Sequence, residues 1–375
     1  MKALACVGMG KTESGILEGF RSAGLEIDEI RVPELTEEKL KEDEYLFAFT
    51  ANFSPEVSAV CQNALVPYLS YLMELPDEAV FHSAVKNPCN FVFCFDKAVC
   101  QELQLVIPGR CFHLPLGADS SWFAEWDAVP EAEVSFSGSL YRVNEAYDNA
   151  EGLSDYAKGY LEALLKTQVR IYGYNLLHAA LNKDIIKELK RVMPQELLSG
   201  DKMIPGAERS FLASQILGNK VTELERKKLL QLVSGKFETH LYTADDSSGL
   251  PGVHVHGPAA TWEERAKVYR NSRINLHFTH RSVSSGVPQE VFEIMAAGGF
   301  VLTNFQPEIP ENFVIGEHLE TFVNEKEMLG KIAYYLEHEE ERVRIAKAGQ
   351  QAVKEYHSYR SRAVTIFNTV FSEKE

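Results

Sequence analysis

The sequence lacks several features that would place it in other protein classes. Its 375 residues contain no run of 18 consecutive apolar residues, and the N-terminal stretch has no signal-peptide cleavage site. No cluster of lysine and arginine offsets the net charge of −16, which arises from 38 basic and 54 acidic residues. This charge would repel a phosphate backbone or an anionic bilayer. We therefore expect a cytoplasmic protein with no transmembrane segment and no nucleic-acid partner.

Cysteine, glycine and histidine patterns exclude further classes. The six cysteines do not form the close pairs of a structural zinc site, so we expect buried thiols outside any disulfide. The segment Gly8–Thr12 lacks the first glycine of a P-loop because residue 5 is Ala5. His254 and His256 alternate on an expected strand, but no third ligand stands at metal-binding spacing. We expect neither a metal nor a bound cofactor.

The sequence does contain two successive series of buried strands. With 45% hydrophobic residues, the chain is long enough for two domains, each with its own core. Alternation of buried strands with helical or loop segments predicts parallel sheets covered by helices, an α/β fold. The predicted strands span residues 2–8, 45–50, 67–71, 90–95 and 111–116 in the first series, and 134–141, 169–173, 237–243, 274–278 and 300–303 in the second.

The apolar periodicity is lost near Asp119–Glu133, which marks the expected boundary between the domains. We predict one domain over residues 1–125 and a second over 126–350, with residues 351–375 forming a helix that returns to the first domain. The leucine-, lysine- and glutamate-rich segment 155–234 predicts helices that elaborate the second domain.

The most informative stretch is Ser282–Asn304, which predicts a small-residue loop, a short helix stopped by two glycines, and a strand. Free amides at the start of such a helix, together with its dipole, favour a diphosphate. Glu293 lies one turn further in, where a carboxylate can accept two hydrogen bonds from a ribose diol. The alternative, an ordinary short helix that packs into a core, fits the pattern equally well. The residues proposed to contact the nucleotide here are Ser285, Gly286, Val287, Glu290 and Glu293.

Other expected strand ends carry further candidates. Gly138 and Ser139 follow a buried strand and precede Arg142, so we predict that this turn approaches a diphosphate; a tight structural turn is comparably consistent. Gly173 and His256 close two further expected strands and are candidates for base and ribose contacts, because parallel sheets bind ligands outside their carboxyl ends. The pair Asp245–Asp246 favours a polar turn.

The segment VPQEVFEIMAAGGFVLTN, with CNFVFCFDK, HLPLGAD, VSFSGSLY and SRINLHFTHRSVSSGVP upstream, resembles the CgeB-like spore-maturation glycosyltransferases. The resemblance covers nearly the whole chain after Asn52. It implies the GT-B superfamily: two Rossmann-like domains that face each other across a cleft, with the donor held by the C-terminal domain. It further implies metal-independent transfer of a sugar from a nucleoside-diphosphate sugar to an unknown hydroxyl acceptor on a glycan, protein or small molecule.

The resemblance also marks two departures. Related transferases often have a sugar-contacting glutamate eight residues before the one at Glu293, and this chain has Ser285 there. CgeB-like sequences commonly have an arginine where this chain has Glu290, so the resemblance implies either that Arg281 or Arg142 supplies the positive charge or that donor binding is weakened. The departures keep open the alternative of a catalytically impaired binding or structural protein. A second alternative is an enzyme resembling a nucleotide-sugar epimerase or phosphorylase, because these enzymes share the two-domain architecture.

An inverting transfer needs a general base near the acceptor hydroxyl. Four residues end or follow strands of the first domain, and of these we favour Asp119 and Glu74 as catalytic. Each could equally be structural. The four candidates are Glu74, Asp77, His113 and Asp119.

Overall fold

The computed structural model describes residues 1–7, 12–42, 44–123, 130–141, 145–193, 203–204 and 207–372. It divides the chain into two compact units. Unit 1 comprises Met1–Ser120, Gly200–Pro205 and Glu355–Glu375, and unit 2 comprises Ser121–Ser199 and Gly206–Lys354. The predicted boundaries lay at 125/126 and 350/351, and the assignment of Gly200–Pro205 to unit 1 was not predicted.

Unit 1 is built on a six-stranded parallel sheet with the order β2-β1-β3-β4-β5-β6. The inner strands are buried along most of their length, which explains their nearly continuous apolar sequences. β2 was not predicted, because it is an edge strand in which charged and apolar residues are mixed (EIDEIR). The strands are β1 (Lys2–Val7), β2 (Glu26–Arg31), β3 (Ala48–Ala51), β4 (Tyr68–Leu72), β5 (Asn90–Cys94) and β6 (Cys111–His113).

Local sequence sets the starts of the helices of unit 1. Ser54 caps α3 by accepting from the amide of Val57, and Asp96 caps α4 by accepting from the amide of Val99. The helices are α1 (Thr12–Ser22), α2 (Glu37–Glu42), α3 (Pro55–Ala64), α4 (Lys97–Val106) and α17 (Tyr359–Phe371), with 3₁₀ turns at Val32–Glu34, Ala79–Phe81 and Ser83–Lys86.

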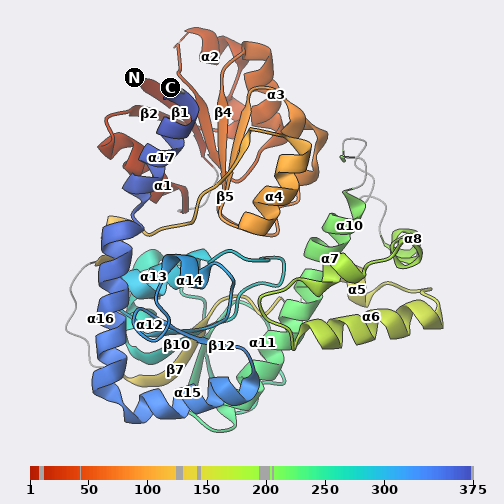
Figure 1. The fold of residues 1–375 in the computed structure, drawn as a ribbon, viewed down its shortest axis with the longest axis vertical. Coiled ribbons are helices and arrows are strands. Elements are labelled where there is room, and N and C mark those ends of the chain that lie inside the picture. Colours follow the sequence, from red (N-terminus) through yellow and green to blue (C-terminus); the bar gives the residue numbers. More distant parts are fainter. Residues whose placement is uncertain are drawn as a thin grey trace. The chain divides into compact units, whose positions relative to one another are not determined.

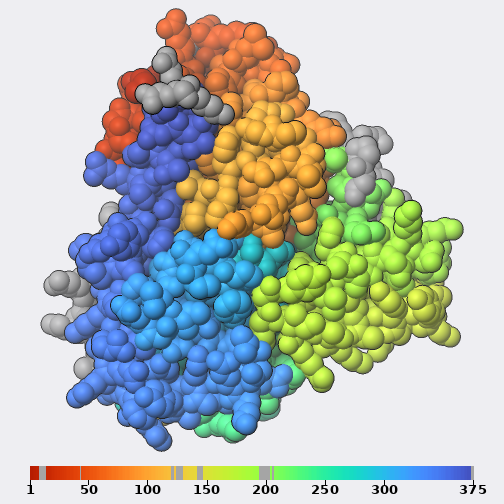
Figure 2. Space-filling model, viewed as in Figure 1, coloured from red at the N-terminus to blue at the C-terminus, as the bar shows by residue number. Residues whose placement is uncertain are grey.

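The last helix, α17, packs along the first helix, α1, within unit 1 (Figure 1). Glycine permits the close approach: a Cβ at Gly19 would lie 2.6 Å from the backbone oxygen of Tyr359. Phe371 stacks on Phe47 at a centroid distance of 5.6 Å, which adds apolar contact at the far end of α17. In Figure 2 the blue C-terminal segment and the red N-terminal segment accordingly share one surface of this unit.

Unit 2 is built on a second six-stranded parallel sheet with the order β12-β11-β10-β7-β8-β9. From β7 the chain proceeds outward through β8 and β9, and then returns to the opposite side of β7 with β10, β11 and β12. The strand order therefore reverses between β7 and β10. The strands are β7 (Ala132–Ser137), β8 (Thr239–Tyr242), β9 (Val253–His256), β10 (Ser272–His277), β11 (Val301–Asn304) and β12 (Glu320–Phe322).

The helices of unit 2 cover this sheet and extend it. Side chains of α11 and α15 form one buried apolar cluster with the strands, while α12 and α13 contact each other and the sheet (Figure 1). The helices are α5 (Glu145–Asp148), α6 (Asp155–Gln168), α7 (Leu176–Ala180), α8 (Lys183–Val192), α10 (Glu208–Phe211), α11 (Gly218–Ser234), α12 (Trp262–Arg270), α13 (Gln289–Ala296), α14 (Ile309–Asn312), α15 (Glu325–Glu337) and α16 (Glu339–Tyr356), with a π-helical turn at Leu212–Leu217. Among the described residues, no helix combines the length and the apolar character needed to cross a membrane.

The predicted strand at 169–173 is wrong. α6 runs to Gln168, and the backbone then turns, with Gly173 at a φ of +73°. The carbonyl oxygens of Val169 and Ile171 accept hydrogen bonds from Arg281, and that of Ile171 also accepts from Gln168. Side chains rather than a neighbouring strand therefore satisfy this segment, which periodicity alone could not show.

Candidate functional site

The reversal of strand order in unit 2 brings two loops together at the carboxyl edge of the sheet. β7 and β10 pair in parallel, with Phe136 opposite Leu276, so the turn at Gly138 and the loop that begins at Phe278 lie side by side. Open α/β sheets bind ligands outside the carboxyl ends of their strands at such a switch point. Several buried polar side chains lie at or near this edge.

Arg226 of α11 bridges the two loops. Its guanidinium donates to the carbonyl oxygens of Ser139 (Nη1, 2.5 Å) and Phe278 (Nη2, 2.6 Å), and it lies over the ring of Tyr141 at 5.1 Å. Arg226 is only 7% exposed, and burial lowers its pKa. Among the described residues, no carboxylate lies within ion-pair distance, and Nε has no hydrogen-bond acceptor. Arg226 was not predicted as a site residue, because it lies in the segment 155–234 that was interpreted as helices added to the second domain.

Two buried histidines end β10 and begin the following loop. The Nδ1 of His277 lies 3.0 Å from the hydroxyl of Thr303, and its Nε2 lies 3.8 Å from the carboxylate of Glu290. Burial lowers the pKa of His277 to about 4. The ring of His280 contacts the ring of Tyr141 in a tilted arrangement, with the centroids 4.5 Å apart, and burial, together with nearby arginines, lowers the pKa of His280 well below the usual value.

Helix α13 begins after Pro288, without a side-chain cap, as expected for the predicted loop and short helix. Glu293 is 4% exposed, and its Oε2 lies 3.2 Å from Nη1 of Arg265 on α12. Burial raises the pKa of Glu293 to about 8, with Arg265 opposing the rise and Glu290 adding to it. The geometry with Arg265 is that of an ion pair without a hydrogen bond, so Oε2 keeps an acceptor position without a hydrogen-bonding partner.

The loop before α13 differs from expectation at Ser285. Its hydroxyl donates to Oε1 of Glu308 at 2.6 Å, and its carbonyl accepts from the amide of Glu308 at 3.0 Å. Glu308 is 1% exposed, so a carboxylate from after β11 stands beside the position where the resemblance implied a glutamate. Gly286 and Val287 are buried in the same loop, and the Glu290 side chain is 47% exposed.

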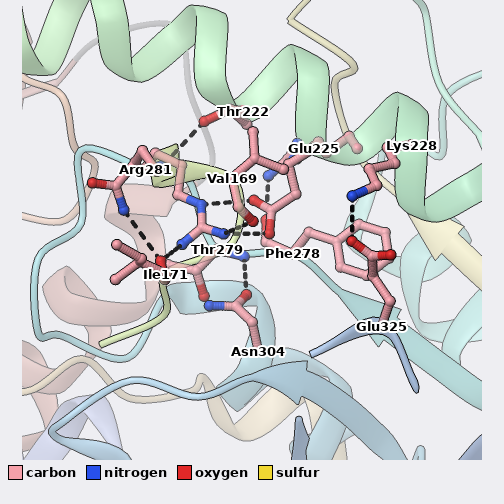
Figure 3. Close-up of polar contacts among 12 residues, drawn as sticks. Val169, Ile171, Thr222, Glu225, Lys228, Phe278, Thr279, Arg281, Asn304 and Glu325 are labelled. Carbon is pink, nitrogen blue, oxygen red and sulfur yellow. Dashed lines mark hydrogen bonds and ion pairs between the residues drawn. The ribbon is translucent and has the colours of Figure 1, made fainter. Parts of the chain in front are cut away.

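The guanidinium of Arg281 is engaged by protein groups and does not have the phosphate-binding position expected from the sequence. Its guanidinium donates to Glu225 from Nε (2.8 Å) and Nη2 (2.5 Å), and to the carbonyl oxygen of Ile171 from Nη1 (2.9 Å) (Figure 3). The side chains of Arg281 and Glu225 are 5% and 0% exposed. Through these contacts Arg281 connects the loop after β10 to α11 and to the segment after α6. Its positive charge is neutralised by Glu225.

The turn after β7 has the expected position, with its side chains used inside the turn. The hydroxyl of Ser139 donates to Asp245 at 2.6 Å and accepts from the amide of Tyr141 at 3.0 Å, and the amide of Leu140 also donates to Asp245. Asp245 thus acts as a turn residue, as predicted. Gly138 has a φ of +154°, which a larger residue would adopt with strain. Arg142 lies outside the described residues.

Two other predicted contacts, Gly173 and His256, do not end strands next to β7 or β10. A Cβ at Gly173 would meet the ring of Phe305 at 3.2 Å, so this glycine packs against that ring instead of ending a strand. His256 is exposed on β9, the edge strand two positions from β7, and it stacks on Tyr242 (4.5 Å) and His240 (5.2 Å). Strand order, which the sequence does not specify, separates His256 from the other candidates.

The two favoured catalytic acids lie in unit 1 in different surroundings. The side chain of Glu74 is exposed in the loop after β4, and its backbone amide donates to Asn52 at 3.1 Å. Asp119 is half-buried and lies close to α1: a Cβ at Gly15 of this helix would be 3.0 Å from Oδ2 of Asp119. An acid beside the first turns of a helix stabilises the helix dipole, a structural role that competes with catalysis. Burial raises the pKa of the neighbouring Asp77 to about 6, although two backbone amides already donate to it.

No group of three or more histidine, cysteine, aspartate or glutamate residues is arranged to hold a metal within the described part of the chain. The cysteines, all described, form no disulfide. The neighbouring histidines His240, His254 and His256 stack on one another at the edge of the sheet.

Comparison with known proteins identifies the fold. Sucrose-phosphate synthase from Thermosynechococcus elongatus superposes with a TM-score of 0.53 at 11% identity over 98% of both chains. Anabaena Alr3699/HepE, solved in complex with UDP and glucose, gives a TM-score of 0.51 at 10% identity over 99% of both chains. This chain has the GT-B fold. The predicted α/β class with two Rossmann-like parallel sheets is therefore confirmed.

Within the GT-B fold, residues 226–368 match the family model described as "Glycosyl transferase-like". The matched segment begins at Arg226 and includes the whole loop around His280 and α13. A protein from Aquifex aeolicus (strain VF5), described as uncharacterized, is 26% identical over 118 residues, which is 31% of this chain. The chain spans 29% of the length of that relative.

Proposed function

We propose that this protein is a glycosyltransferase that transfers a sugar from a nucleoside-diphosphate sugar to a hydroxyl acceptor. The GT-B fold, the glycosyl transferase-like match over residues 226–368, and a structural neighbour solved with UDP and glucose support this proposal. We also propose that the protein is cytoplasmic, that it is CgeB-like, and that the transfer does not depend on a metal.

One observation carries the proposal: buried polar atoms without partners surround the switch point of unit 2. Among the described residues, Nε of Arg226 and Nε2 of His280 lack acceptors, and Oε2 of Glu293 lacks a hydrogen-bond donor. Buried polar groups are nearly always hydrogen-bonded in native proteins, and a bound ligand or an ordered water molecule would supply the missing partners. Donors suit phosphate oxygens, and a carboxylate suits the hydroxyls of a ribose.

The proposed chemistry uses these groups to hold the leaving diphosphate. Glycosyl transfer places growing negative charge on this group, and preorganised donors stabilise it in a site shielded from water. Arg226 supplies a fixed positive charge, and the amides at the start of α13 add the positive end of the helix dipole. Glu293 would accept from the ribose, and Glu74 or Asp119 of unit 1 would accept the proton of the acceptor hydroxyl.

A thermal-shift screen of nucleosides, nucleoside mono- and diphosphates, and nucleotide sugars tests donor binding. A ligand at 100 times its Kd stabilises the folded state by about 2.7 kcal/mol. We expect one nucleoside diphosphate to raise the Tm of the wild type. The rise should disappear in Glu293→Ala and persist in Glu263→Ala, which removes an exposed acid from α12. Unaltered stabilisation in Glu293→Ala would contradict the ribose role.

A second measurement separates catalysis from binding alone. Glycosyltransferases can hydrolyse their donor slowly when no acceptor is present, so the cognate nucleotide sugar should release its nucleoside diphosphate over hours. Binding without any turnover, with or without candidate acceptors, would favour an impaired binding protein. Conversion of the sugar without release of the diphosphate would favour epimerase chemistry.

A further inference from the structure

We infer that His280 is a neutral hydrogen-bond donor, and that Nε2 of His280 and Nε of Arg226 form an anion-binding site for the diphosphate of the ligand. This inference rests on the proposed function, since it names the residues that recognise the diphosphate of the donor. Neither residue was singled out by its sequence.

The hydrogen bonds around His280 fix the position of its proton. The backbone amide of Ser282 lies 3.1 Å from Nδ1 of His280, and a backbone amide can only donate. Nδ1 is therefore an acceptor without a proton, and the hydroxyl of Ser282, at 2.7 Å, donates to the same atom or lies beside it. A neutral imidazole carries its single proton on the other nitrogen, so Nε2 is an N–H donor.

The surroundings keep this imidazole neutral. The side chain is 6% exposed, and Arg226 and Arg281 are the charged groups that act on it. Burial and these two cations lower its pKa, so the ring remains uncharged at neutral pH. His280 thus presents one fixed N–H group whose strength does not change across the physiological pH range.

The Nε2–H group has no acceptor in the described part of the chain, although it is fully shielded from solvent. The ring of Tyr141 lies 4.5 Å from the ring of His280 and 5.1 Å from the guanidinium of Arg226, so all three side chains meet at one place. Nε of Arg226 is a second buried donor without an acceptor. Two unmatched donors that adjoin a single aromatic ring indicate an acceptor-rich ligand.

The charge of Arg226 specifies the chemical class of that ligand. A buried charge is normally paired, yet no carboxylate within ion-pair distance of Arg226 is found among the described residues. The nearby Glu225 is paired with Arg281, and Asp245 accepts from Ser139 and Leu140. An anion with several oxygens, such as a diphosphate, would satisfy both the donors and the charge.

A matched pair of substitutions isolates the donor at Nε2. In His280→Asn the amide oxygen can still accept from Ser282 in the place of Nδ1, but nothing reaches the position of Nε2. In His280→Gln the longer side chain carries an N–H group to that position. Isothermal titration calorimetry would measure nucleoside, nucleoside monophosphate, nucleoside diphosphate and inorganic pyrophosphate binding to the wild type and to both variants.

We expect His280→Asn to weaken nucleoside diphosphate and pyrophosphate binding by about 10- to 100-fold, as for loss of a hydrogen bond to a charged group. Nucleoside binding should remain unchanged, and His280→Gln should recover most of the diphosphate affinity. Equal diphosphate affinity in His280→Asn and the wild type would overturn the inference and leave the proposed function intact. If the wild type binds pyrophosphate but no nucleotide, and His280→Asn loses the pyrophosphate binding, the proposed function would be overturned and the anion-binding site supported. Binding of neither molecule to the wild type would overturn both.

The position of the proton provides a readout that does not depend on ligand affinity. In ¹⁵N-histidine-labelled protein, long-range proton–nitrogen spectra distinguish protonated from unprotonated ring nitrogens, and the resonances missing from His280→Asn identify the ring of His280. We expect a neutral ring with its proton on Nε2 from pH 6 to 8. A proton on Nδ1, or a charged ring at pH 7, would overturn the inference whatever the ligand affinities of the variants.

Discussion

The buried pair between Arg281 and Glu225 makes the stability of unit 2 depend on a single carboxylate. Glu225 is fully buried, and it accepts two hydrogen bonds from Arg281. In Glu225→Gln the shape of the side chain is kept but its negative charge is removed. Arg281 then remains buried with a positive charge but without an anionic partner, because its other contacts are carbonyl oxygens and the ring of Tyr172 at 4.3 Å.

The expected cost follows from the burial of both partners. Breaking a buried ion pair by removing one charge costs about 3–5 kcal/mol, because the remaining charge is left uncompensated. For a domain of 150–250 residues, each kcal/mol shifts Tm by about 2–4 °C. We therefore expect Glu225→Gln to lower the Tm of unit 2 by about 6 to 20 °C.

The same helix offers a matched control. Lys228 lies one turn beyond Glu225 on α11 and pairs with Glu325 (Figure 3), but these side chains are 39% and 38% exposed. An exposed pair contributes less than about 1 kcal/mol, so Lys228→Gln should shift Tm only slightly. Differential scanning calorimetry and urea unfolding would measure both variants. A Glu225→Gln variant no less stable than Lys228→Gln would refute the argument from burial.

Three further predictions concern pH, thiols and the general base. Because the pKa of His277 is about 4 in the folded state and near 6.5 in the unfolded chain, the folded protein binds fewer protons between these values. Its stability should therefore fall as pH drops from 6.5 to 4, and His277→Gln should make the fall measured by urea unfolding less steep. Burial raises the pKa of the Cys89 thiol to about 11, and the other five cysteines are buried. Ellman's reagent should therefore react slowly with the native protein, whereas after denaturation it should react rapidly with all six thiols. Glu74→Gln and Asp119→Asn separate the candidate bases. Loss of transfer with donor affinity and Tm preserved would identify the base, whereas a lower Tm with transfer retained in Asp119→Asn would give Asp119 a structural role beside α1.

Sequence patterns predicted the sheets well because buried parallel strands leave a strong local record. β5 and β10 are apolar runs bounded by polar residues, and their positions agree with expectation to within two residues. The mixed edge strand β2 and the three-residue β12 leave no such record and were not predicted. Segment 169–173 has a strand-like composition, but the guanidinium of Arg281 satisfies its carbonyl groups from far along the chain.

The candidate site was predictable only where one segment builds it. The loop and helix around Glu293 are contiguous, so their sequence indicated both the turn and the helix start. Arg226 enters the site from a helix more than 50 residues before His280, and no local pattern distinguishes it from other arginines of amphipathic helices. The same limit applies to Glu308, which reaches Ser285 from beyond β11.

The packing of α17 on α1 has a consequence for the order in which the protein folds during synthesis. The strands of unit 1 leave the ribosome first, but one of the helices that cover them is made only after all of unit 2. Until Tyr359–Phe371 emerges, the surface around Phe47 and the glycines of α1 is exposed to solvent. The chain of unit 2 is therefore completed before that of unit 1, and Met1–Ser120 lacks one of its covering helices until Tyr359–Phe371 has been made.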